Sequence, residues 1–92
     1  MWAIVEAKDV AKTVAKAPAR IADEYELWKS IVRTSGVHAL RAMKGMRDEA
    51  LSGEWKGFRS SRLSGQWRVI YRSETTEVVV YVVRVTPHDY RR

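Results

Sequence analysis

The second half of the sequence carries the side chains best suited to acid–base chemistry on a phosphate. Glu49 stands in a polar segment punctuated by glycines, Arg68 lies in an alternating stretch, and His88 and Tyr90 follow Pro87. An imidazole or a carboxylate can transfer a proton, whereas a guanidinium stabilises phosphate charge through paired hydrogen bonds. A phenol can stack on a base or orient a phosphate. These four residue types together favour chemistry on a phosphate ester.

The reaction that such a set suits is cleavage of RNA without a metal. The ribose 2′-OH is an internal nucleophile beside the scissile phosphate, so the protein supplies a base, an acid and cations. With two His and no Cys, a zinc site is improbable and no disulfide framework exists. The sequence contains no phosphate-binding P-loop, glycine-rich dinucleotide motif, HExxH motif or nucleophile elbow. We therefore expect neither a metal nor a cofactor.

The positive charge is concentrated in the same half of the chain. The net charge is +6, yet residues 1–54 hold nine Lys and Arg against eight Asp and Glu. Residues 55–92 hold eight basic residues against three acidic ones, and seven of the eight are Arg. This imbalance favours a phosphate-bearing partner, although an acidic protein would also fit it.

The first half of the chain predicts a strand and two helices. Trp2 to Glu6 is typical of a short strand, and Asp9 can cap a helix that ends before Pro18. A second helix is predicted from about Pro18 to Gly36, because apolar residues recur there at helical spacing. Val37 to Met43 then adds one or two helical turns. The stripe on the second helix is formed by Ile21, Tyr25, Trp28 and Val32, widened by Leu27 and Ile31.

The second half predicts three strands after a polar loop that runs from Lys44 to Gly57. The strands are expected at Phe58 to Leu63, Trp67 to Arg72 and Glu77 to Val85. The last is apolar on both faces, as a central strand requires. We predict a single α+β domain spanning residues 1–92 in the order β-α-α-β-β-β, with a twisted, mainly antiparallel sheet and two helices packed on one face.

Alternation along these strands indicates which side chains can meet. Arg68 points away from the face of Trp67, with Ile70 and Arg72. Arg62 shares that face only if it pairs with Arg68 across the hairpin, which requires the odd loop Ser64-Gly65-Gln66 rather than a two-residue turn on Ser64-Gly65.

Each candidate also has a structural interpretation. Arg68 could be an ion-pair partner of Glu77 or Glu6, Glu49 a solvated loop carboxylate, and His88 a surface residue. His38 lies among helical residues and is interpreted as structural.

The stretch from about Gly45 to Arg92 resembles the RelE/HigB superfamily of type II toxins, the ribosome-dependent mRNA interferases. The resemblance rests on Asp48-Glu49-x-Leu51-x-Gly53, Arg59-Ser-Ser-Arg62-Leu63, Trp67-Arg68-Val-Ile-Tyr71 and His88-Asp89-Tyr90-Arg91. The closing motif is similar to that of the HigB-like branch. The half before Gly45 supplies only the expected order of elements.

The resemblance implies roles for individual residues. Arg68 would contact the scissile phosphate, Glu49 would be the general base, His88 an acid or charge stabiliser, and Tyr90 would stack on or orient the substrate. The paired lysines typical of RelE itself are absent, because Arg59 and Ser61 occupy that neighbourhood, which favours Glu49 with His88. Further RNA contacts are implied for Lys56, Arg59, Arg62 and Arg91.

The resemblance also implies partners: a cognate antitoxin protein, and the ribosome with mRNA in its A site. The apolar stretch Trp2 to Val5 is too short for a signal peptide and nothing approaches a membrane span, so we expect a cytoplasmic protein without a membrane partner. Two alternatives remain. One is a ParE-like toxin that inhibits DNA gyrase by binding alone, which would not need the set Glu49, Arg68, His88 and Tyr90. The other is a non-catalytic module that binds RNA or the ribosome.

Overall fold

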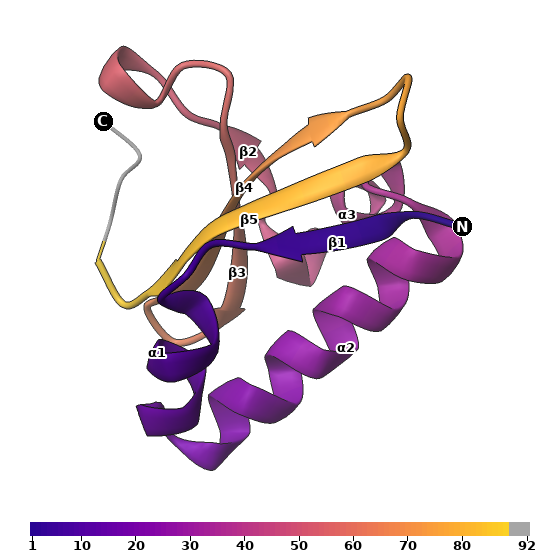
Figure 1. The fold of residues 1–92 in the computed structure, drawn as a ribbon. Coiled ribbons are helices and arrows are strands. Elements are labelled where there is room, and N and C mark those ends of the chain that lie inside the picture. The colour runs from indigo at the N-terminus through magenta and orange to yellow at the C-terminus, as the bar shows by residue number, and fades with distance from the viewer. Residues whose placement is uncertain (89–92) are drawn as a thin grey trace.

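A twisted five-stranded sheet forms the frame of the molecule (Figure 1). The computed structural model describes residues 1–88. The strands are Ala3–Glu6 (β1), Glu49–Ala50 (β2), Arg59–Ser64 (β3), Trp67–Glu74 (β4) and Val79–Thr86 (β5). Their order is β1-β5-β4-β3-β2, with β1 parallel to β5 and every other pair antiparallel. The predicted α+β fold is confirmed, and β5 is an interior strand between β1 and β4, as its two apolar faces predict.

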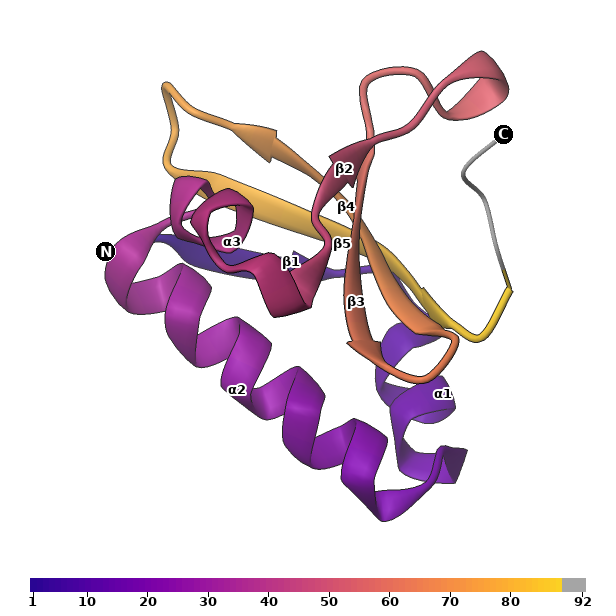
Figure 2. The same ribbon diagram turned by 180° about the vertical axis from the view of Figure 1, so that it is seen from behind.

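The helices precede most of the sheet in the chain and pack on one of its faces. They are Val10–Lys16 (α1), Ala19–Ser35 (α2) and His38–Ala42 (α3), with short 3-10 turns at Lys44–Met46 (η1) and Gly53–Trp55 (η2). Both views place α1 and α2 on the same side of the sheet, while the segment that contains η2 projects on the other side (Figures 1 and 2). We call the face away from α1 and α2 the open face.

The apolar stripe of α2 builds the core as its spacing predicts. Its four residues Ile21, Tyr25, Trp28 and Val32 are all buried. The Trp28 ring stacks on Tyr25 at 6.0 Å between centroids and meets Tyr71 of β4 edge-on at 5.4 Å. Leu27, expected to widen the stripe, is instead 51% exposed, because its position on the helix lies outside the arc that the sheet covers.

Gly36 ends α2 where the chain comes closest to the first strand. Its φ of +80° is unfavourable for residues with a Cβ, and a Cβ here would lie 2.6 Å from Nε1 of Trp2. The amide of Trp2 donates to the carbonyl of Arg33 at 3.3 Å. A glycine at this position therefore both ends the helix and lets β1 start against it.

The hairpin between β3 and β4 has the expected pairing but a different loop. Arg62 lies opposite Arg68, as the shared-face prediction requires. Ser64 pairs with Trp67, so the loop is the two residues Gly65-Gln66, and the odd residue is taken up by a register shift at Leu63. A bulge of this kind adds one residue without a longer loop.

Three other expectations are corrected. The segment from Lys44 to Gly57 is not all loop, because β2 joins the sheet beside β3. A two-residue strand is too short to produce an alternation that sequence could reveal. Asp9 makes no side-chain capping bond to α1. Strand β5 starts at Val79, because Val78 with its φ of 58° belongs to the preceding turn.

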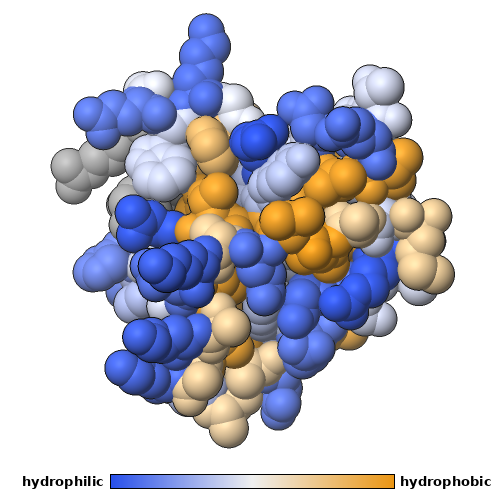
Figure 3. Space-filling model, in the orientation of Figure 1, coloured by the Kyte–Doolittle hydropathy of each residue, from blue (hydrophilic) through white to orange (hydrophobic). Residues whose placement is uncertain are grey.

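The open face is apolar at one end. Ala3 and Val5 of β1 lie beside Val79 and Tyr81 of β5, and Val5 is 48% exposed. Figure 3 shows hydrophobic residues gathered over these strands, among hydrophilic surroundings. Within residues 1–88, no helix is long and apolar enough to cross a membrane.

Candidate active site

Three of the predicted site residues, Glu49, Arg62 and Arg68, lie together at the other end of the open face. Sheet register puts them there: Glu49 lies opposite Ser60, Arg62 opposite Arg68, and Arg68 opposite Thr86. The intervening residues of β4 and β5 point toward α2, since Val69 and Val85 belong to the buried core. Four strands thus each contribute to one polar cluster on a single face.

Arg68 is the centre of this cluster and is almost completely buried, at 6% exposure. Its Nε donates to Oγ of Ser60, and its Nη2 donates to the carbonyl oxygen of Arg47 at 3.2 Å. These bonds hold the guanidinium plane in one orientation. Because a guanidinium stays protonated in proteins, Arg68 provides a fixed positive charge at the open face.

Glu49 forms an ion pair with this cation. Its Oε1 lies 3.7 Å from Nη2 of Arg68, and its side chain is 43% exposed. The two residues that the sequence proposed as base and phosphate contact are thus brought together. Neither Glu77 nor Glu6 occupies this place, and Glu6 instead accepts a hydrogen bond from Tyr25 at 2.5 Å.

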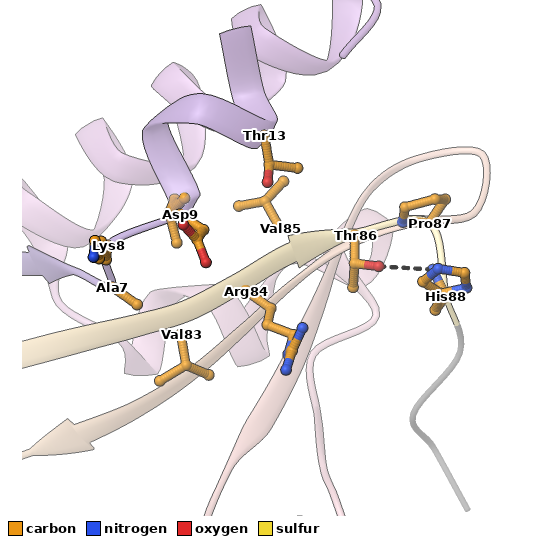
Figure 4. Close-up of a pocket in the computed structure, with 11 residues that line it drawn as sticks. Ala7, Lys8, Asp9, Thr13, Val83, Arg84, Val85, Thr86, Pro87 and His88 are labelled. Carbon is orange, nitrogen blue, oxygen red and sulfur yellow. Dashed lines mark hydrogen bonds between the residues drawn. The ribbon is translucent and has the colours of Figure 1, made fainter. Parts of the chain in front are cut away.

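His88 follows the end of β5 and is held by its backbone. The amide of His88 donates to Oγ1 of Thr86 at 3.1 Å, and Thr86 is the residue paired with Arg68 (Figure 4). The exposed imidazole lines a hollow of about 440 Å³ between the start of α1 and the end of β5. Lys8 and Asp9 lie across this hollow, and Arg84 lies on its β5 side (Figure 4).

The basic residues proposed to bind RNA do not all lie together. Arg62 is on the open face, where its Nε donates to the carbonyl of Gly65 at 3.2 Å. Lys56 is exposed in the segment between β2 and β3. Arg59 was expected beside Arg68, but it lies on the opposite face and pairs with Asp48 at 2.6 Å. The reason is strand alternation, which puts residues three apart on opposite faces. Tyr90 and Arg91 lie outside the described residues.

Asp48 forms a second polar cluster on the helix side of the same strands. Its carboxylate is fully buried and accepts hydrogen bonds from Nε of Arg59, from Oγ of Ser61 at 2.6 Å and from the hydroxyl of Tyr71. Burial raises the pKa of Tyr71, and the bond to Asp48 raises it further. The hydroxyl therefore stays protonated as the donor.

Sequence reasoning missed several residues of these two clusters. Ser60 and Thr86 lie near Arg68 through strand registers that contain shifts, which the sequence alone does not reveal. The ring of Trp55 meets Phe58 edge-on, with 5.2 Å between centroids, and lies 5.9 Å from the guanidinium of Arg84. No sequence pattern indicated this position for Trp55. Among residues 1–88, no group of three or more His, Asp or Glu side chains is arranged to hold a metal ion.

Comparison with solved structures connects this arrangement to known proteins. No protein-family model matches the sequence, and no curated protein matches it significantly. By structure, the chain is similar to RelE in the archaeal RelE-RelB complex from Pyrococcus horikoshii OT3, with a TM-score of 0.73 and 20% identity over 94% of this chain and 93% of that one. The chain has the fold of these proteins. The expected RelE-like fold is thereby confirmed, whereas nothing distinguishes the HigB-like branch.

Two further neighbours have similar scores. The YafQ chain of the E. coli DinJ-YafQ toxin-antitoxin complex gives a TM-score of 0.70 at 20% identity, covering 91% of this chain and 89% of that one. The YoeB/ParE toxin from Agrobacterium tumefaciens gives 0.71 at 19% identity, covering 95% and 99%. At these identities the similarity shows the fold alone.

Proposed function

We propose that this protein is the toxin of a type II toxin–antitoxin system and that it cleaves mRNA on the ribosome. The observation that carries the proposal is the pair of Glu49 and Arg68, 3.7 Å apart on the open face. A half-exposed carboxylate beside a buried, oriented guanidinium offers the base and the cation that attack of a 2′-OH on a phosphate can use.

The residues divide the reaction between them. Glu49 takes the proton of the 2′-OH, and Arg68 stabilises the charge that develops on the phosphorane oxygens. Because the bonds to Ser60 and the Arg47 carbonyl already orient Arg68, little reorganisation is needed as charge builds up. His88 protonates the leaving 5′-oxygen or stabilises its charge. No metal takes part in this scheme.

The remaining roles concern substrate binding. Lys56 and Arg62 contact phosphates on either side of the scissile bond, and Arg62 is well placed because it lies opposite Arg68. Tyr90 stacks on or orients the substrate and Arg91 binds phosphate, as the family resemblance implies. Arg59 is left out of this proposal, since its guanidinium pairs with Asp48 on the other face.

The proposal includes the partners and the compartment. The ribosomal A site would hold the mRNA in the geometry needed for in-line attack, and a cognate antitoxin would silence the free toxin. Solved neighbours include the YafQ chain of a toxin-antitoxin complex, which supports an antitoxin partner. Such an enzyme acts where ribosomes are, in the cytoplasm.

The alternative is a ParE-like inhibitor of DNA gyrase that binds without catalysis. The fold suits both functions, since one neighbour bears both names. The Glu49–Arg68 pair favours the nuclease, because a protein that acts by binding alone needs no carboxylate beside a phosphate-binding cation.

Primer extension on a reporter mRNA in a reconstituted translation system tests the proposal. Wild type should cut at A-site codons, whereas Glu49→Gln and Arg68→Lys should not, and omission of ribosomes should abolish cutting. Glu54→Gln, an exposed carboxylate in the same segment, and Arg33→Gln on α2 are matched controls. Intact mRNA in the presence of a folded, growth-inhibiting protein would overturn the nuclease and direct the work to a gyrase supercoiling assay.

A further inference from the structure

We infer that Asp48 is a positioning residue, which holds Glu49 and Arg68 in place from the opposite face of the sheet. The inference concerns the geometry of the site, and its consequence for cleavage rests on the proposed function. It begins with the weakness of β2, which carries Glu49. This strand has two residues, in which Glu49 pairs with Ser60 and Ala50 with Arg59, and one further backbone bond follows it, from the amide of Leu51 to the carbonyl of Phe58 at 2.9 Å. So short a ladder does not fix a side chain by itself.

The Asp48 carboxylate supplies the missing anchor. It is fully buried and accepts from three donors, two on β3 (Arg59 and Ser61) and one on β4 (Tyr71). A buried carboxylate with three donors is held in one position, because losing any of them leaves a charge or a polar group unsatisfied. The residue before Glu49 is therefore fastened to β3, the strand that pairs with β2, and to β4 beyond it.

The same two strands carry the open-face site on their other side. Ser61 follows Ser60, which accepts from Arg68, and Tyr71 belongs to the strand that carries Arg68. Alternation sends Ser61 and Tyr71 toward α2 and sends Ser60 and Arg68 to the open face. The Asp48 cluster and the Arg68 cluster thus lie on opposite faces of the same two strands.

Arg47 shows that the anchor acts on Arg68 as well. Its backbone is left-handed, with φ 43° and ψ 46°, a conformation that residues with a Cβ adopt only when their surroundings enforce it. In this conformation its carbonyl oxygen accepts from Nη2 of Arg68 at 3.2 Å. The fastened Asp48 side chain, one residue later, keeps that carbonyl aimed at the guanidinium.

Replacing Asp48 by Asn should release this arrangement while leaving the side chain nearly the same size. An amide has one acceptor oxygen, and its NH₂ group would face donors, so the three bonds cannot all be kept. β2 then loosens, the Arg47 carbonyl turns away, and Glu49 and Arg68 lose their mutual geometry. Catalysis suffers more than binding, because displacement of catalytic groups by about 1 Å costs about a hundredfold.

The Nε–H of Arg68 reports the geometry directly, because it is buried and bonded to Ser60. In wild type its ¹H–¹⁵N signal should exchange slowly with water, and in Asp48→Asn at least about tenfold faster. Cleavage by Asp48→Asn in the translation system should show kcat lowered about tenfold to a hundredfold and KM changed less than about threefold. Asp23→Asn, an exposed Asp on α2, should change neither.

The outcomes separate this inference from the proposed function. Unchanged Arg68 exchange in a folded Asp48→Asn protein would overturn the inference, whether or not the protein cleaves RNA. Faster exchange without any wild-type cleavage would uphold it and overturn the nuclease. If Asp48→Asn does not fold, Ser61→Ala and Tyr71→Phe each remove one donor and should accelerate exchange of the Arg68 signal by smaller factors; no change in either would overturn the inference.

Discussion

Asp48 and Glu49 are adjacent carboxylates in opposite environments. Asp48 lies on the helix side of the sheet, fully buried, with three donors around it. Glu49 lies on the open face, 43% exposed, 3.7 Å from one cation. The Asp48 carboxylate is surrounded by its hydrogen-bond donors, while the Glu49 side chain is partly open to solvent. The difference shows that moving one residue along a strand can change a carboxylate from fully buried to partly exposed.

Arg59 of β3 and Arg68 of β4 show the same difference between the two faces of the sheet. Arg59 pairs with Asp48 at 2.6 Å on the helix side, and Arg68 lies 3.7 Å from Glu49 on the open face. The closer pair therefore belongs to the face that is packed against the core. If this division is correct, substitutions on the open face should change activity, and those on the helix side should change stability and the position of the site.

The largest effect is expected for Glu49→Gln. Loss of a general base lowers cleavage about 10²- to 10⁴-fold, whereas unfolding should change little because the side chain is half exposed. Primer extension and thermal unfolding of the same protein measure the two effects. Comparable loss of stability would place Glu49 with the structural residues and remove the contrast with Asp48.

Asp48→Ala, in contrast to Glu49→Gln, should clearly lower the free energy of unfolding. It leaves the guanidinium of Arg59, only 22% exposed, without its partner and leaves two hydroxyls without an acceptor. We expect a loss of about 2–4 kcal/mol in the free energy of unfolding, measured by urea denaturation. A loss below that of the surface variant Asp23→Ala would contradict the structural assignment.

Alkaline pH should weaken the helix-side cluster. Burial and the bond to Asp48 raise the pKa of Tyr71, so the native protein holds this proton more tightly than the unfolded chain, whose tyrosines titrate near pH 10.0. The contribution is complete below that pH and is lost as pH rises through the native pKa.

Above about pH 10, the free energy of unfolding should therefore fall by up to about 1.4 kcal/mol per pH unit for this residue. Tyr25, whose pKa is raised by burial and by its bond to Glu6, adds to the same slope. Tyr71→Phe should reduce the slope, as denaturation at pH 9, 10 and 11 would reveal. An identical slope in wild type and Tyr71→Phe would show that the Tyr71 phenol does not contribute to the loss of stability at alkaline pH.

The smallest effect is expected for Thr86→Val on the open face. The variant keeps the shape but removes the acceptor for the His88 amide, a bond worth about 1 kcal/mol. If that bond places His88, cleavage should drop about fivefold with little change in unfolding. Thr13→Val, at the α1 side of the same hollow, is the matched control. Equal rates for both variants would show that the bond has no part in the reaction.

Local patterns in the sequence predict much of this fold. The helical stripe of Ile21, Tyr25, Trp28 and Val32 determined which side of α2 is buried, because a period of 3.6 residues needs no tertiary information. Alternation around Arg68 determined its face, and the family resemblance indicated Glu49 as its companion. The roles of Tyr90 and Arg91, outside the described residues, stay predictions from sequence.

Only the tertiary structure decided which residues meet across strands. β2 has no periodicity to detect in two residues, so nothing local shows that Asp48 turns inward and Glu49 outward. The pairing of Arg59 with Asp48 and of Arg68 with Thr86 depends on registers set by a shift at Leu63 and another beside Val83. Such registers depend on how whole strands pack, because moving a strand by one residue exchanges its two faces.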